Sequence, residues 1–212
     1  MTAEQEKQAA AEAAAEFVRD GMAVGLGTGT TVAYLLPALA RRKLSIRCVA
    51  TSPRTERLAT GLGLDVRPFD TLDRLDICID GADQIAPDGW LIKGGGGAHT
   101  REKIAAAAAD RFIVIAGSTK PVPALHPPVP VELLKFGIAA TLRRLGPVTL
   151  REVPESPDGG VIADHHSPID DPARLAAQLC ATPGLVAHGL FQPDLVSVIL
   201  IGRGSTVEHR TP

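Results

Sequence analysis

The stretch from Leu75 to Lys103 concentrates residue types that carry out acid–base chemistry. Its sequence, LDICIDGADQIAPDGWLIKGGGGAHTREK, contains Asp80, Asp83, Lys93 and Glu102, with four consecutive glycines between the last two. A positioned carboxylate can move protons, and an ammonium group beside bare backbone N–H groups stabilises negative charge on oxygen. The stretch therefore points to proton transfer on a substrate that gains negative charge on its oxygen atoms.

Two short apolar runs bring these side chains to one edge of a predicted sheet. Leu75–Ile79 is typical of a buried strand, and a glycine permits the bend that follows at Asp80–Asp83. Trp90–Lys93 is a second apolar run and leads into the turn of Gly94, Gly95, Gly96 and Gly97. In open α/β sheets, ligands bind at the carboxyl ends of the strands. We therefore expect the acids and Lys93 to border a ligand crevice.

Each of these charged residues also has an ordinary structural interpretation. The two aspartates are common in turns and caps, and Glu102 suits the first turn of a helix. Lys93 fits the exposed end of a strand. The convergence of four charged groups on one sheet edge favours a functional site, because independent surface charges have no reason to meet there.

A second glycine-rich segment joins a predicted strand, Met22–Leu26, to a predicted helix, Val32–Ala40. Its residues include Gly27, Thr28, Gly29, Thr30 and Thr31. Backbone N–H groups at a helix start, together with threonine hydroxyls, form an anion site. The spacing is neither GxGxxG nor that of a P-loop, so a single phosphate fits better than a dinucleotide. A tight turn with threonine caps is the structural alternative.

The composition is that of an ordinary globular protein of 212 residues, 45% hydrophobic and 22% charged. A net charge of −2 gives no general attraction to nucleic acid or to anionic membranes. Cys48, Cys78 and Cys180 are odd in number and widely spaced, which indicates buried thiols rather than disulfides or zinc ligands. The sequence shows no signal-peptide core and no apolar run near the about 18 residues of a membrane span, so we expect a cytoplasmic protein.

Strand and helix patterns alternate through the first half of the chain and predict a parallel sheet in a Rossmann-like, doubly wound α/β domain. The other predicted elements are a capped helix over Glu4–Arg19, strands at Ile46–Ala50, near Val66 and at Arg111–Ala116, a helix from Ser52 to Gly61, and a helix capped by Thr100. The hydroxyls of Thr51, Ser52 and Thr55 are either helix caps or further phosphate donors.

A proline-rich hinge near His126 begins a second, smaller unit of ferredoxin-like α+β type. Its predicted elements, in the order βαββαβ, are Val129–Leu133, Lys135–Leu145, Val148–Val153, Gly160–Ala163, Pro172–Cys180 and Leu185–Leu190. Val196–Ile201 is an apolar strand that returns to the first sheet, and we expect the polar tail after it to fray. The predicted domains are therefore 1–126 with 197–212, and 127–196.

No metal site is expected. His165 and His166 lack further ligands at suitable spacing, so a surface turn is the better interpretation. The three carboxylates near the glycine turn are magnesium-type ligands, but Lys93 already supplies positive charge beside them.

Several motifs together resemble the A type of the ribose-5-phosphate isomerase family. They are GLGTGTT, TSPRT, DGADQ, LIKGGGGAHTREK and PVPVEL, followed by TPGLVAHGLF and VILIG, in the family's order over nearly the whole chain. The resemblance implies interconversion of ribose 5-phosphate and ribulose 5-phosphate in the pentose phosphate pathway, without cofactor or metal. It also implies a homodimer or homotetramer whose small-molecule partner is a sugar phosphate, with no nucleic acid or membrane partner.

Carried over by position, the resemblance gives each charged residue a role. It makes Glu102 the catalytic base, Asp80 the carboxylate of ring opening and proton relay, and Lys93 the group that stabilises the oxyanion. Asp83 becomes the neighbour of Asp80 in the site. The remaining matches are the substrate loop from Gly27 to Thr31, the glycine turn from Gly94 to Gly97, and a phosphate clamp of Lys7 and Lys120.

The chain departs from the family pattern at a few positions. Gln84 stands where the family usually has glutamate, which removes a charge and affects either Asp83 or a loop contact. Thr30 replaces a serine but keeps the hydroxyl. His99 is also atypical, and it either lines the site or, as the better interpretation, is a partly exposed residue at a helix start.

Two other functions are compatible with parts of this pattern. A sugar-phosphate sensor without catalysis needs the phosphate loops but not Asp80, Lys93 and Glu102 together. Half of an acyl-CoA transferase places a nucleophilic glutamate near glycines, and it would catalyse a CoA-dependent exchange.

Overall fold

The alternating apolar runs form a seven-stranded sheet with the order β14-β13-β7-β4-β1-β2-β3. The computed structural model describes residues 2–212. Neighbouring strands in this sheet are parallel except for β13 and β14, which pair antiparallel. The strands are β1 (Ala23–Leu26), β2 (Arg47–Ala50), β3 (Asp65–Val66), β4 (Ile77–Gly81), β7 (Phe112–Gly117), β13 (Val198–Arg203) and β14 (Thr206–Arg210).

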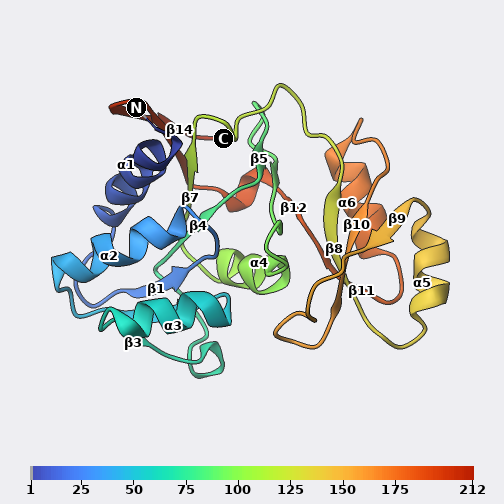
Figure 1. Cartoon of the computed structure of the whole chain (residues 1–212), viewed down its shortest axis with the longest axis horizontal. Coiled ribbons are helices and arrows are strands. Elements are labelled where there is room, and N and C mark those ends of the chain that lie inside the picture. The colour runs from blue at the N-terminus through green and yellow to red at the C-terminus, as the bar shows by residue number, and fades with distance from the viewer. Residues whose placement is uncertain (1) are drawn as a thin grey trace. The chain divides into compact units, whose positions relative to one another are not determined.

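The winding of this sheet reverses between β1 and β4, which lie side by side (Figure 1). From β1 the chain moves outward to β2 and β3, whereas β4 leads the other way to β7. Such a reversal is a topological switch point, where doubly wound sheets bind ligands beyond the carboxyl ends of their strands. The loop that begins at Gly27 and the residue Asp80 both lie at this edge, as the sequence predicts.

Helices α1 (Ala3–Ala15) and α2 (Val32–Arg42) pack against each other and share one core with the sheet. The side of α1 that enters the core consists largely of alanine, which lets the helix approach the strands closely. Alternate strand residues such as Ile77 and Ile79 join this core. Because successive side chains point to opposite faces of a sheet, Asp80 projects from the other face.

The sheet, with α1, α2 and α3 (Pro53–Gly61), belongs to a first unit made of the chain up to Ala82, Arg101–Lys120 and Asp194–Pro212. Helix α4 (His99–Ala107) begins in the second unit and continues into the first. Short 3-10 turns occur at Phe69–Thr71 and Pro193–Leu195.

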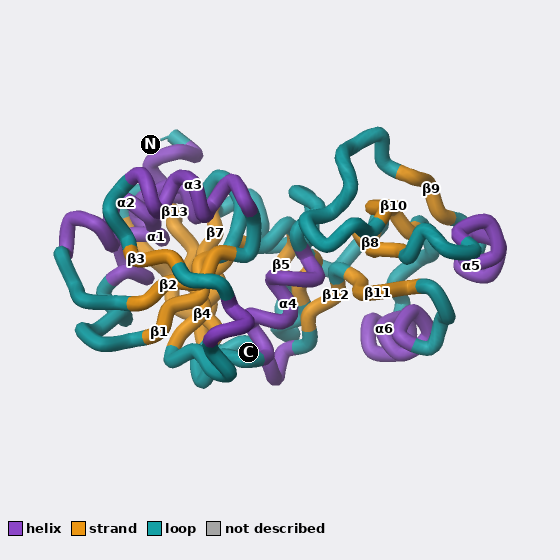
Figure 2. Tube along the Cα trace, turned by 90° about the horizontal axis from the view of Figure 1, so that it is seen from below, coloured by secondary structure: helices purple, strands orange, loops and turns teal. Residues whose placement is uncertain are grey.

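The second unit comprises Asp83–Thr100 and Pro121–Pro193 and contains the predicted βαββαβ motif. Its elements are β8 (Val129–Leu133), α5 (Ile138–Leu145), β9 (Val148–Leu150), β10 (Val161–His165), α6 (Pro172–Cys180) and β11 (Leu185–His188). They form an antiparallel sheet of order β11-β8-β10-β9, the strand arrangement of a ferredoxin-like domain. Figure 2 shows helices α5 and α6 in purple beside these strands.

A small antiparallel sheet of order β12-β6-β5 completes the second unit. It joins β5 (Gln84–Ile85) and β6 (Leu91–Ile92) to β12 (Leu190–Phe191). Residues 83–100 therefore group with the second unit, whereas the sequence predicts them in the first. Strand pairing with β12 and the packing of Ile92 into the core of the second unit account for the difference.

Two local expectations were wrong. The polar tail forms β14, which pairs with β13 over five residue positions and packs Val207 against the first core. Cys180 is exposed at the end of α6, although Cys48 and Cys78 are buried as expected. Within residues 2–212, no helix has both the length and the apolar character needed to cross a bilayer.

Candidate active site

Asp80 is fully buried at the end of β4, and the first glycine loop closes over it. Its Oδ1 accepts hydrogen bonds from the N–H groups of Thr28, at 2.9 Å, and Gly81, at 2.7 Å. A Cβ atom built on Gly27 would stand 1.9 Å from the carboxyl carbon of Asp80. Only a residue without a side chain fits there, so this glycine is needed to accommodate Asp80.

Hydroxyl groups at the start of α3 hold the same loop. Thr28 Oγ1 lies 3.0 Å from Thr51 Oγ1 and 3.4 Å from Thr55 Oγ1. The Thr55 hydroxyl also donates to the Gly27 carbonyl at 2.9 Å. Ser52 caps α3, because its Oγ accepts from the Thr55 N–H at 3.2 Å. The cap interpretation therefore holds for Ser52, whereas Thr51 and Thr55 hold the glycine loop in place.

The far end of this loop is open to solvent. Gly29 and Thr30 are exposed, and Gly29 has φ +119°, a backbone conformation that favours glycine. Thr31 occupies the N-cap position of α2, but its side chain makes no capping hydrogen bond. The threonine-cap alternative is therefore wrong for Thr31, and the role of the loop in binding phosphate stays a prediction.

Lys93 directly follows β6 and is only 2% exposed, which excludes the interpretation as an exposed strand-end lysine. Its N–H donates to the Gly189 carbonyl at 2.9 Å, and its Nζ lies 5.4 Å from the ring centroid of Phe191. A Cβ atom on Gly189 would stand 2.2 Å from the Lys93 carbonyl oxygen. Close backbone packing thus fixes the position of Lys93, and an aromatic face is a favourable neighbour for its charge.

Hydrogen bonds hold the glycine turn that follows Lys93. Asp83 Oδ2 accepts from the Gly95 N–H at 2.7 Å, and the Gly97 N–H donates to the Gly94 carbonyl at 3.0 Å. Gly94 and Gly97 have φ +101° and +73°, which only glycine adopts readily. Two of the four N–H groups are therefore bonded within the protein, which corrects the expectation of an entirely bare turn. Gly94 and Gly96 remain as candidate donors to a substrate.

His99 is fully buried against the glycine turn, which corrects the expectation of partial exposure. A Cβ atom on Gly94 would stand 2.7 Å from His99 Nδ1. Helix α4 begins at His99, and the next residue, Thr100, donates its hydroxyl to the carboxylate of Glu132 in β8. The expected cap role of Thr100 is therefore wrong. Glu132 is only 2% exposed, and buried carboxylates require such donors.

Glu102 lies in the first turn of α4 and is only 4% exposed. A glutamate that merely complements a helix dipole normally stays in solvent, and carboxylates are rarely buried without a specific partner. Its neighbours one turn later, Ala105 and Ala106, are buried as well. The burial of Glu102 therefore favours a functional carboxylate over a simple dipole complement.

Lys7 and Lys120 approach the end of β7 within the first unit. The Lys7 side chain passes Gly117, where its Cγ would lie 3.7 Å from an added Cβ, and its ammonium pairs with Glu4 at 3.0 Å. Lys120 closes a turn in which its N–H donates to the Gly117 carbonyl at 3.2 Å. The Lys7 side chain and the Lys120 backbone thus both lie at the end of β7.

Glu6 links α1 to the loop after β7 and to the hairpin between β13 and β14. Its carboxylate accepts from the N–H of Gly204 at 3.0 Å, and from the hydroxyl and N–H of Ser118 at 2.5 and 3.1 Å. These hydrogen bonds, with that from Gly204 the largest cause, lower the pKa of Glu6 from 4.5 to about 2.

We expect Glu6→Gln to lower stability at neutral pH but not at strongly acidic pH. A depressed pKa in the folded state adds stability above the unfolded-state pKa of 4.5, and this stability is lost as the pH falls toward about 2. Urea midpoints of the two proteins should differ most above pH 5 and converge on approach to pH 2. A difference that stays constant from pH 7 to pH 3 would contradict the assignment.

Comparison with known proteins places this architecture in one family. The family model for ribose 5-phosphate isomerase A (phosphoriboisomerase A) matches residues 47–206. A ribose-5-phosphate isomerase A of Rhodopseudomonas palustris is 45% identical, over 95% of this chain and 96% of the relative. The chain belongs to the ribose 5-phosphate isomerase A family. It is therefore an enzyme of the isomerase class, and the resemblance noted in its motifs is confirmed.

Solved structures of ribose 5-phosphate isomerases share the fold over the full chain. That from Neisseria gonorrhoeae has a TM-score of 0.94 and 32% identity, and covers 100% of this chain and 98% of that one. A D-ribose-5-phosphate isomerase in complex with phospho-erythronic acid has the same TM-score and identity, with 100% coverage of both chains. The α/β fold class is thus confirmed. Residues 2–57 also match the DeoR C terminal sensor domain, a segment that ends before Asp80.

Gln84, where the isomerase family usually has glutamate, bonds to the proline-rich hinge. Its Nε2 donates to the His126 carbonyl at 2.8 Å, and its Oε1 accepts from the His126 N–H at 2.9 Å. A carboxylate cannot donate to a carbonyl, so the amide satisfies this backbone position in both directions. Of the two expected consequences of Gln84, the structure supports the loop contact.

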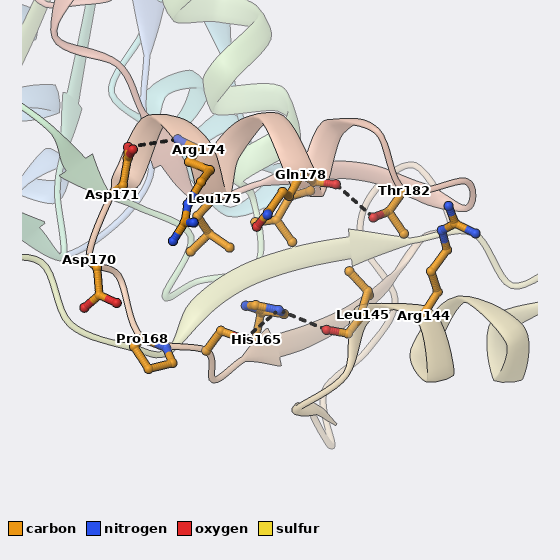
Figure 3. A pocket seen from close by; sticks show the side chains of 12 residues that line it. Arg144, Leu145, His165, Pro168, Asp170, Asp171, Arg174, Leu175, Gln178 and Thr182 are labelled. Carbon is orange, nitrogen blue, oxygen red and sulfur yellow. Dashed lines mark hydrogen bonds between the residues drawn. The ribbon is translucent and has the colours of Figure 1, made fainter.

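A groove of about 380 Å³ in the second unit of this isomerase is lined by none of the residues predicted for the site (Figure 3). His165 lies in its wall, with Nε2 3.2 Å from the Leu145 carbonyl, and burial lowers the pKa of this imidazole. His166 is exposed and its Nε2 lies 2.8 Å from the Thr149 hydroxyl. The predicted surface turn therefore holds for His166 and is wrong for His165, which faces the ferredoxin-like core from β10.

Proposed function

We propose that the chain interconverts D-ribose 5-phosphate and D-ribulose 5-phosphate through an enediolate, with Glu102 as the base. The observation that carries the proposal is the burial of Asp80, Lys93 and Glu102, at 0%, 2% and 4% exposure, within motifs that match the family. Buried ionisable groups are costly and mark functional sites more often than surface charges do. The phospho-erythronic acid bound by a full-length relative is a phosphorylated sugar acid, which agrees with this substrate class.

In the proposed reaction, one carboxylate moves one proton between adjacent carbon atoms. Glu102 removes the proton from C2 of the open-chain aldose, and the electron pair forms the C1–C2 double bond of the enediolate. Glu102 then returns the proton to C1, while the hydroxyl proton of O2 passes to O1 and O2 becomes the ketone oxygen. Atoms and electrons balance in this reaction without an external oxidant, reductant or metal ion.

Negative charge develops on O1 and O2 during these steps, and fixed donors stabilise it. We assign this role to the Lys93 ammonium and to the N–H groups of Gly94 and Gly96, because donors that are already oriented cost no reorganisation. The Asp83 carboxylate, which holds the Gly95 N–H, orients the turn in this scheme rather than contacting the reacting carbons.

Ring opening must precede isomerisation, and we assign it to Asp80. Its carboxylate takes the proton of the anomeric hydroxyl and passes it to the ring oxygen, while the bond between C1 and the ring oxygen breaks and the C1 carbonyl forms. The hydrogen bonds from Thr28 and Gly81 to Oδ1 orient the carboxylate for this transfer.

The substrate phosphate supplies binding energy far from the reacting carbons, and we place it against Lys7, Lys120 and the loop from Gly27 to Thr31. Lys120→Met should therefore raise KM for ribose 5-phosphate by about tenfold and change kcat by less than about threefold. Steady-state kinetics measure both constants. Lys135→Met, which removes an exposed lysine paired with Glu155, is the control and should change neither. A loss confined to kcat would contradict the phosphate role.

The decisive test of the proposed function is an assay of the purified protein. The protein should equilibrate ribose 5-phosphate with ribulose 5-phosphate in the presence of EDTA and without an added cofactor. We propose that it does so in the cytoplasm, in the pentose phosphate pathway, as a homodimer or homotetramer. Binding of ribose 5-phosphate without turnover would instead support the second candidate, a sugar-phosphate sensor, which the match of residues 2–57 to a sensor domain favours.

A further inference from the structure

Arg151, which directly follows β9, contacts the glycine turn from a distant part of the sequence. Its Nη1 donates to the carbonyl oxygens of Gly94, at 2.9 Å, and Gly95, at 3.0 Å. Its Nε and Nη2 donate to the two carboxylate oxygens of Asp164 in β10, at 2.7 and 2.6 Å. A bidentate pair of this kind fixes the plane of the guanidinium. Asp164 therefore holds Arg151 in place, and Arg151 holds two consecutive carbonyl groups.

The peptide unit between Gly94 and Gly95 is bonded at both ends by opposite charges. Its carbonyl accepts from Arg151, and its N–H donates to the carboxylate of Asp83 at 2.7 Å. The carbonyl and the N–H of a trans peptide point in opposite directions and lie in one plane. Rotation of this unit would break a charge-assisted hydrogen bond on each side.

Among the residues that the structure describes, Arg151 holds the next peptide unit at its carbonyl end, and none holds its N–H. The hydrogen bond from Arg151 to the Gly95 carbonyl directs the Gly96 N–H away from the guanidinium. Gly96 is an exposed residue, so this peptide unit lies at the surface of the protein. A cationic donor on the carbonyl also polarises the peptide and strengthens the N–H as a donor.

We propose that Arg151 is a positioning residue, which orients the Gly96 N–H toward the negative charge that develops on the substrate. The inference rests on the proposed isomerase function and deepens it. Four consecutive glycines give a backbone that can approach a ligand closely but has great conformational freedom. Electrostatic catalysis needs donors that are already oriented. The hydrogen bonds from Arg151 and to Asp83 restrict the conformation of the glycine turn.

An ordinary structural ion pair is the competing explanation for Arg151 and Asp164. Both side chains are 18% exposed, and partly exposed pairs contribute little to stability. A purely structural pair would change thermal stability without a selective effect on the chemical step. The kcat and KM of variants therefore distinguish the two roles.

The test compares Arg151→Met and Arg151→Lys with Arg143→Met, which removes an exposed arginine of α5 in the same unit. Arg151→Met should lower kcat by about 10²-fold, the scale of a misplaced donor, with KM changed by less than about threefold. Arg151→Lys keeps the charge but not the planar fork, so we expect an intermediate kcat. Millimolar guanidinium should partly restore kcat to Arg151→Ala but not to Glu102→Gln.

A second readout does not depend on activity. Amide hydrogen exchange in the peptide that covers residues 91–98 should become faster in Arg151→Met and Arg151→Lys and stay unchanged in Arg143→Met. Unchanged exchange in Arg151→Met would show that Arg151 does not hold the turn. Faster exchange with a kcat within about twofold of wild type would overturn the positioning role. Failure of the wild-type protein to isomerise ribose 5-phosphate would refute the proposed function instead, and exchange would still decide whether Arg151 orders the glycines.

Discussion

Glu102→Gln should lower kcat for the interconversion of ribose 5-phosphate and ribulose 5-phosphate by about 10²-fold or more, the usual effect of losing a general base. Glutamine has the size and shape of glutamate, so the buried position in α4 is kept. Its amide cannot accept the proton from C2, so formation of the enediolate slows. A coupled assay measures kcat, and thermal unfolding checks that the fold is retained.

Glu56→Gln provides the matched control for this prediction. Glu56 also lies in the first turn of a helix, α3, but it is exposed and belongs to none of the proposed contacts. Its replacement should leave kcat and KM unchanged. Full activity of Glu102→Gln would show that another group acts as the base, and a loss confined to KM would assign Glu102 to binding.

Gly27→Ala should lower kcat nearly as much as Glu102→Gln, although it adds only one methyl group. The new Cβ would stand 1.9 Å from the Asp80 carboxyl carbon and 2.4 Å from its Cβ, so either the loop or Asp80 must move. Displacement of a catalytic group by about 1 Å can cost about 10²-fold in rate. Overpacking in a buried region should also lower the free energy of unfolding by about 1–3 kcal/mol. Kinetics and urea unfolding measure the two effects.

Gly61→Ala is the control for added volume, because nothing lies within 4 Å of a Cβ at that position of α3. Alanine is also the better helix former, so stability should stay the same or rise slightly. If Gly27→Ala kept wild-type kcat and stability, the loop could yield without moving Asp80, and the proposed dependence of Asp80 on Gly27 would be wrong.

The parts of the site that could be predicted from the sequence depend on local patterns. A glycine-rich loop after a short apolar strand predicted the turn at Gly27, and the alternation of strands and helices predicted a parallel sheet. The carboxyl ends of its strands had to share one edge, which placed Asp80 at the same edge as that loop. These inferences need only strand direction and chain connectivity, and the switch point between β1 and β4 agrees with them.

The contacts that hold the glycine turn could not be predicted, because they depend on strand pairing in the second unit. Arg151 lies more than fifty residues beyond Gly94, and only the register of β9 with β10 sets it beside Asp164. His99 was expected at the surface because polar residues are common at helix starts. Its burial follows from the fold of the turn above it, where the absence of a side chain on Gly94 makes room for the imidazole.

The polar tail was predicted to fray but forms an ordered strand. Thr206–Arg210 is polar, and polarity near a chain end favours fraying. Backbone hydrogen bonds to β13 outweigh this tendency, and the ion pairs of Glu208 with Arg203 and Arg210 suit an edge strand. Edge strands tolerate charged residues and even favour them, so polarity alone does not separate a frayed tail from such a strand.

The path of the chain through the two units affects the order in which the protein can fold during synthesis. The backbone passes from one unit to the other four times, after Ala82, Thr100, Lys120 and Pro193. Strand β13, which pairs with the buried strand β7, belongs to the last segment. During synthesis, β7 therefore lacks its neighbour β13 until the ribosome has added the whole ferredoxin-like motif. Folding of the first sheet is completed only after the final strands emerge, although its first strand is among the earliest residues made.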